Sequence, residues 1–173
     1  SMSDTGEFRS LEPLGFPLYS INDLGDVMNN DTWTPKTHFK NQNGFRFVSL
    51  YQGSRRMSRQ VSALVAETFI RGMYPLEWCT IIYLDGDVDN VKASNLAYRP
   101  RSYAVRYHRA VRGVNRSTWH LNHVATDWDG TELFFDNVVD SAMRFGILME
   151  DVLKALDTGE SPVFAPNVTF QIV

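Results

Sequence analysis

Residues 81–98 read IIYLDGDVDNVKASNLAY. The β-branched and aromatic residues between Cys79 and Leu84 predict a strand, because such side chains suit a pleated surface. Asp85-Gly86-Asp87 then predicts a tight loop, since Asp and Gly readily adopt turn conformations. Upstream, Val61 to Ile70 has apolar residues at helical spacing, and downstream residues 102–112 have the pattern of a helix. This mixture of short strands and helices predicts the α+β class.

The C-terminal third has the same mixed character. We expect strands near 121–126, at 133–135 and at 169–173. Two short helices are expected at about 138–145 and 149–157, with Gly146 between them, because apolar residues there recur at helical spacing.

We expect three modules along the chain. Asn43-Gly44 predicts a hairpin that continues into a strand at residues 45–50. The clearest boundary is a linker at 113–119. The expected modules cover residues 1–55, 56–116 and 117–173.

The composition argues against several classes of protein. The chain has 173 residues, 43% of them hydrophobic, which is enough for a buried core, and its apolar runs are too short to span a membrane. The N-terminus shows no signal-peptide pattern. The one cysteine, Cys79, excludes an intramolecular disulfide and a cysteine-cluster zinc site. It indicates a reducing compartment, and we expect the cytoplasm.

Charge is divided unevenly along the chain, whose formal net charge is −3. Residues 46–116 hold twelve Lys or Arg against five Asp or Glu, while residues 117–173 hold two against nine. The middle third is therefore a candidate phosphate-binding surface, and the C-terminal third would repel phosphate.

The basic middle third predicts contact with DNA. Between Asp89 and Asp127 there is no acidic residue, and Arg106, Arg109 and Arg112 recur every third residue, which predicts one stripe on a helix. Tyr103 and Tyr107 are interleaved with this stripe and could offer hydroxyls to phosphate. A second basic cluster is expected in a loop before the helix at 61–70. The candidate DNA-binding residues are Arg55, Arg56, Arg59, Lys92, Arg99, Arg101, Arg106, Arg109, Arg112 and Arg116.

The order of these elements resembles HNH homing endonucleases encoded by phages and introns. Residues 15–27 look like the N-terminal module of these enzymes, and residues 64–70 look like the helix before their active site. Residues 81–98 align without a gap to their ββα-metal motif, and residues 121–173 resemble their C-terminal helix-turn-helix repeat. The resemblance implies an α+β fold of short mixed modules around a ββα-metal core, with a C-terminal helix-turn-helix.

The resemblance also implies metal-assisted hydrolysis of a phosphodiester, with a His as general base, two metal ligands and an orienting Asn. In this sequence Tyr83 occupies the position of the base, and Ile82 and Ala104 occupy those of the ligands. Tyr is a poor base at neutral pH, and Ile and Ala have no lone pair for a hard cation. Only Asn95 is retained. The sequence therefore predicts a degenerate site with no metal, no cofactor and no enzymatic activity.

The expected function is DNA binding without cleavage, by a phage regulator of transcription or replication. Two alternatives remain open. One is an inhibitor of a host enzyme that binds its protein partner, of host or phage origin, through the acidic residues 117–173. The second expected helix of this segment carries Glu150, Asp151 and Asp157 where a DNA reader would carry cations. The other is an HNH endonuclease with a relocated active site, for which His108, His120 and His123 lie nearby in sequence.

Overall fold

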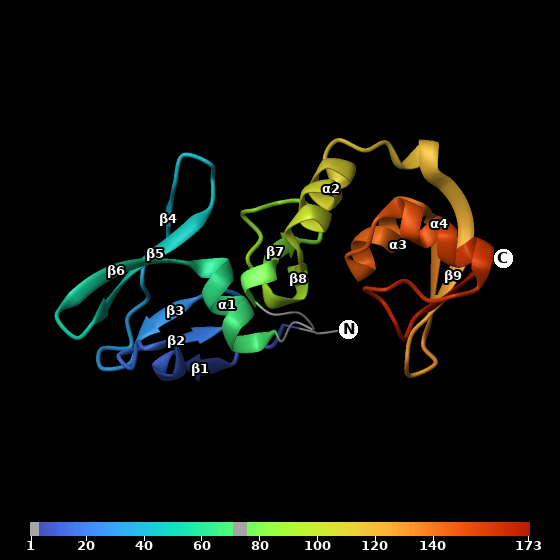
Figure 1. Ribbon diagram of the computed structural model, residues 1–173. Coiled ribbons are helices and arrows are strands. Elements are labelled where there is room, and N and C mark those ends of the chain that lie inside the picture. Colours follow the sequence, from blue (N-terminus) through green and yellow to red (C-terminus); the bar gives the residue numbers. More distant parts are fainter. Residues whose placement is uncertain (1–3, 71–75) are drawn as a thin grey trace. The chain divides into compact units, whose positions relative to one another are not determined.

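The computed structural model describes residues 4–70 and 76–173 (Figure 1). The chain forms two compact units, Ser1–Tyr83 with Asp87–Pro100, and Leu84–Gly86 with Arg101–Val173. Each unit has its own hydrophobic core. The division into three modules stays a prediction from the sequence. Within the described ranges, no helix combines the length and apolarity that crossing a bilayer requires.

The N-terminal unit is built from small antiparallel sheets around one helix, α1 (Val61–Phe69). The sheets have the orders β1-β2-β3, β4-β5-β6 and β7-β8. Their strands are β1 (Phe8–Ser10), β2 (Tyr19–Asn22), β3 (Val27–Asn29), β4 (Phe39–Lys40), β5 (Arg46–Gln52), β6 (Arg55–Gln60), β7 (Cys79–Tyr83) and β8 (Leu96–Pro100). The apolar stripe of α1 buries Leu64 and Val65 in a core that also contains Phe16 and Ile21, so that one core joins sequence-distant sheets.

Strand β6 corrects one expectation from the sequence. Arg55, Arg56 and Arg59 lie on this strand, not in a loop. β5 and β6 form a hairpin in which Gln52 pairs with Arg55, and Gly53 adopts a φ of 62° at the turn, a region that favours glycine. The strand is polar and lacks apolar alternation, so its pairing with β5, not its own composition, makes it a strand.

The C-terminal unit places helices against a three-stranded sheet with the order β10-β9-β11. Its elements are α2 (Arg101–Val111), β9 (His120–Thr126), β10 (Glu132–Asn137), α3 (Val138–Phe145), α4 (Met149–Thr158) and β11 (Thr169–Ile172). Gly146 ends α3 with a φ of 65°, and its N–H donates to the Ala142 carbonyl, which allows α4 to begin three residues later. Figure 1 shows α3 and α4 as consecutive short helices, and the α+β prediction is confirmed.

Candidate nucleic-acid interface

The three positions that the resemblance assigns to HNH chemistry are buried. Ile82 is fully buried on β7, and Ala104 is buried on α2 in the other unit. The hydroxyl of Tyr83 lies 2.7 Å from Ser62 Oγ, and burial raises the pKa of this phenol. Tyr83 is therefore protonated at neutral pH and buried in the core of the N-terminal unit.

Asn95 lies at the end of the loop that follows β7. Its Nδ2 donates to the Asn90 carbonyl at 2.9 Å, and its backbone N–H donates to the Lys92 carbonyl at 2.9 Å. The backbone N–H of Asn90 in turn donates to the Asp87 carbonyl. Asn95 thus holds the loop in shape through local hydrogen bonds.

Tyr103 sets the orientation of α2 within the C-terminal unit. Its hydroxyl donates to Asp151 Oδ2 at 2.7 Å and accepts from the Leu148 backbone N–H at 2.8 Å. Its ring meets Phe164 edge-on, with centroids 4.5 Å apart. Tyr107, one turn further along, is fully buried. The expectation that both tyrosines offer their hydroxyls to phosphate is wrong, because partners distant in sequence bury them.

The opposite face of α2 is exposed and basic. Arg101, Val105, Arg109 and Arg112 are all exposed, and their spacing of four, four and three residues places them on one side of the helix. Arg112 directly follows α2 and continues its last turn, since its N–H donates to the His108 carbonyl. Within the described ranges, none of these three arginines forms an ion pair. This set, called here the α2 arginine face, is available to phosphate.

Arg106 lies at the flank of α2 and not on that face. Its Nη2 is 2.7 Å from Glu150 Oε1 on α4. The spacing of three residues in the sequence predicts a stripe of Arg106, Arg109 and Arg112, but the burial of Tyr103 turns Arg106 toward the acidic start of α4.

The basic residues of β6 differ in their exposure. Arg55 and Arg56 are exposed near the β5–β6 turn, and Arg56 Nε donates to Ser49 Oγ at 2.6 Å. Arg59 is partly buried and pairs with Glu67 at 3.4 Å. Arg55 and Arg56 are therefore the better placed for contact with phosphate.

Of the remaining candidates, Lys92 is exposed, whereas Arg99 and Arg116 have partners within the protein. Lys92 is exposed in the loop after β7. Arg99 is partly buried and donates to the carbonyl of Tyr98 at 2.7 Å. Arg116 Nε lies 2.7 Å from Asp140 Oδ1. Lys92 and Arg116 are both exposed, but Arg116 is already paired with a carboxylate.

The sequence reasoning missed a basic cluster in the N-terminal unit. Lys36, His38 and Arg46 line a hollow of about 450 Å³. Arg46 also pairs with Asp89, as does Lys40, and hydrogen bonds from these two cations lower the pKa of Asp89 to about 2. A local count would have found the cluster, because residues 36–46 hold three cations and no Asp or Glu.

The histidines differ in whether their ring nitrogens have partners within the protein. Both ring nitrogens of His38 and of His123 have hydrogen-bond partners. His108 is partly buried, and burial together with nearby Arg112 lowers its pKa. His120 is exposed at the start of β9.

The donor set at the HNH positions does not fit a divalent ion. Ile82 and Ala104 carry hydrocarbon side chains, and hard cations require oxygen or imidazole ligands. In the part of the chain that the structure describes, no three His, Cys, Asp or Glu side chains are grouped so that they could hold a metal.

The fold is similar to that of a solved structure. The HNH homing endonuclease I-HmuI, whose structure is described as one of DNA binding and cleavage, matches 96% of this chain and 98% of its own, with a TM-score of 0.54 and 18% identity. No family model and no curated protein matches the chain. The fold is thus that of an HNH endonuclease over nearly its whole length.

This similarity corrects the prediction that the protein is not an enzyme. That prediction rested on three side chains, whereas the match extends through both units to a protein that cleaves DNA. The replacement of the HNH base by Tyr83 and of the metal ligands by Ile82 and Ala104 therefore concerns these three positions alone. It does not decide whether the chain is an enzyme.

Burial of Tyr83 predicts a loss of stability at alkaline pH. Because burial raises its pKa above the ordinary value of 10.0, the folded state holds this proton more tightly than the unfolded chain. The resulting stability is fully present below about pH 10 and is lost as pH rises through the folded pKa. Tyr83→Phe should make the unfolding midpoint in urea less dependent on pH in this range. Exposed Tyr51→Phe is the control, and equal pH profiles for wild type and Tyr83→Phe would contradict the assignment.

Proposed function

We propose that this protein binds duplex DNA through the α2 arginine face and through Arg55 and Arg56, and that it acts on this DNA as an endonuclease. The observation that carries the proposal is the fold, which is shared over 96% of the chain with an enzyme that binds and cleaves DNA. The exposed arginines supply the second line of support.

The charge of the α2 arginine face suits a phosphate backbone. Arginine presents a planar fork of donors that matches phosphate oxygens, and it stays charged at all working pH values. Since these arginines have no carboxylate partner within the described ranges, binding phosphate breaks no existing ion pair. Val105, which is 57% exposed among them, offers an apolar contact of the kind that a thymine methyl accepts.

Hydrolysis in this proposal uses groups other than Ile82, Tyr83 and Ala104. Two of these side chains are apolar and the third is a buried phenol. This is the relocated active site that the sequence left open as an alternative.

The finer roles remain predictions from the sequence. A part in phage transcription or replication is one of them. Location in the cytoplasm, inferred from the single cysteine Cys79, is another.

Removal of the α2 arginine face should weaken DNA binding and its dependence on salt. Each phosphate contact on duplex DNA contributes about 0.9 to the slope of log affinity against log salt, so Arg101, Arg109 and Arg112 changed together to Ala should lower the slope by about 2–3. The measurement is fluorescence anisotropy with labelled duplex at several salt concentrations. Arg106→Ala is the matched control, since this arginine is already paired with Glu150.

The same preparations test cleavage. Incubation with supercoiled DNA, with and without divalent cations, should give nicked product with the parent protein and with Tyr83→Phe, and much less with the triple variant. Tight binding by the parent without any product would contradict the endonuclease half of the proposal. An unchanged slope and affinity in the triple variant would contradict the binding half.

Release of Arg106 should strengthen DNA binding. An exposed ion pair is worth about 0–1 kcal/mol, so Glu150→Gln should raise affinity by about two- to fivefold and steepen the salt dependence. The control is Glu160→Gln, which removes the same charge from an exposed position of the same unit without breaking an ion pair among the described residues. Equal effects of the two changes would show that only net charge matters.

A further inference from the structure

The sheet of the C-terminal unit exposes large apolar side chains on β10 and in the turn before it. Phe134 is 72% exposed on β10, and Trp128 in the turn between β9 and β10 is 74% exposed. The neighbouring Phe135 points the other way, stacking on buried His123 with centroids 5.5 Å apart and contributing to the core. Alternation along the strand therefore places Phe134 on the outer face. Phe134 is not a member of the hydrophobic core of this unit.

The same hairpin is acidic. From Ser117 to Met143 the sequence contains no Lys or Arg, and four acidic residues belong to the hairpin, namely Asp127, Asp129, Glu132 and Asp136. Glu132 and Phe134 occupy alternate positions of β10 and project from one face, whereas Asp136 lies where the register with β9 shifts between Phe135 and Asn137. A face of this charge repels the phosphate backbone of DNA.

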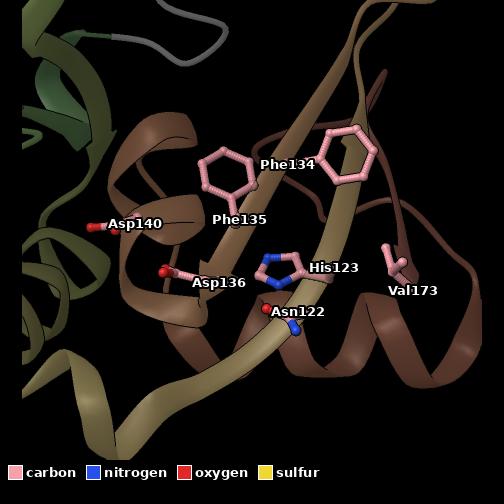
Figure 2. Close-up of a pocket in the computed structure, with 7 residues that line it drawn as sticks. All are labelled: Asn122, His123, Phe134, Phe135, Asp136, Asp140 and Val173. Atoms are coloured by element: carbon pink, nitrogen blue, oxygen red, sulfur yellow. The ribbon is translucent and has the colours of Figure 1, made fainter.

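Phe134 and Asp136 border a hollow of about 520 Å³, shown in Figure 2. Asn122 from β9 and Val173 complete its exposed rim, and in the close-up the ring of Phe134 lies apart from that of Phe135. The floor is fixed, because Nε2 of His123 contacts Ser141 Oγ at 2.8 Å. The hollow thus combines an exposed ring, an amide and the carboxylates of Asp136 and Asp140, the second of which is paired with Arg116.

We propose that this face of β9 and β10, called here the acidic hairpin face, binds a Lys- or Arg-rich segment of a partner protein. Charge complementarity selects the partner, since residues 117–143 contain no Lys or Arg and Arg116, which approaches the hollow, is already paired with Asp140. A cation placed over the ring of Phe134 gains a cation–π attraction, and a second cation of the same segment can pair with Asp136, which borders the same hollow. An exposed aromatic ring beside a pocket is also the usual form of an interface anchor. This inference does not depend on the proposed DNA cleavage.

The test uses a defined peptide probe. A short synthetic peptide that alternates Lys and Val is titrated into the full chain by isothermal calorimetry at about 0.15 M salt, where charges beyond about 8 Å are screened. A peptide that alternates Glu and Val is the probe control. The acidic hairpin face should bind the Lys peptide and not the Glu peptide, and absence of Lys-peptide binding by the parent would overturn the proposal.

Matched double variants locate the binding. Phe134→Ser with Asp136→Asn should weaken binding of the Lys peptide by about tenfold or more, as expected for an anchor residue. Val163→Ser with Asp157→Asn removes an equally exposed apolar residue and an exposed acid elsewhere in the unit, and should leave binding within about twofold. Equal weakening by both double variants would overturn the proposal, because it would show unspecific attraction to net charge.

A folding control keeps the test decisive. Phe134 lies outside the core cluster of the unit, so both double variants should unfold at the parent's urea midpoint. Should the Phe134 variant unfold early, Asp136→Asn alone provides the second variant, and an affinity for the Lys peptide equal to the parent's would then overturn the proposal.

Discussion

The hydrogen bonds of Tyr103 decide which side of α2 faces solvent. By donating to Asp151 and accepting from the Leu148 N–H, this hydroxyl joins α2 to the start of α4. With Tyr103 and Tyr107 buried, the helix must expose the side that carries Arg101, Arg109 and Arg112. The arrangement also brings Arg106 to Glu150. The candidate DNA surface of the C-terminal unit is therefore a consequence of one buried phenol.

Local patterns in the sequence predicted most elements of the fold. Apolar residues at helical spacing predicted α1 and α2 to within a residue or so at each end, and Gly146 marked the break between α3 and α4. Strand β6 was missed because its polar sequence forms a strand only through pairing with β5. Periodicity alone assigned Arg106 to the exposed stripe, since its partner Glu150 lies 44 residues away in sequence.

The fold and the side chains give different information about catalysis. The chain has the fold of an endonuclease, yet Ile82, Tyr83 and Ala104 are buried and do not fit the metal and base that the HNH resemblance implies. All three side chains are buried, and Tyr83 belongs to the core of the N-terminal unit, so each of them removes apolar surface from water. The arginines of the α2 arginine face have exposed side chains that belong to neither core. DNA binding is accordingly the part of the account with direct support from exposed side chains.

Arginine footprinting tests that part most directly. The full chain is treated with an arginine-specific dicarbonyl reagent, with and without saturating duplex DNA, and the rate of modification at each arginine is measured by mass spectrometry. The account predicts that DNA slows modification of Arg101, Arg109 and Arg112, while Arg144 on α3 reacts at an unchanged rate. Equal rates for the three α2 arginines with and without bound DNA would contradict it.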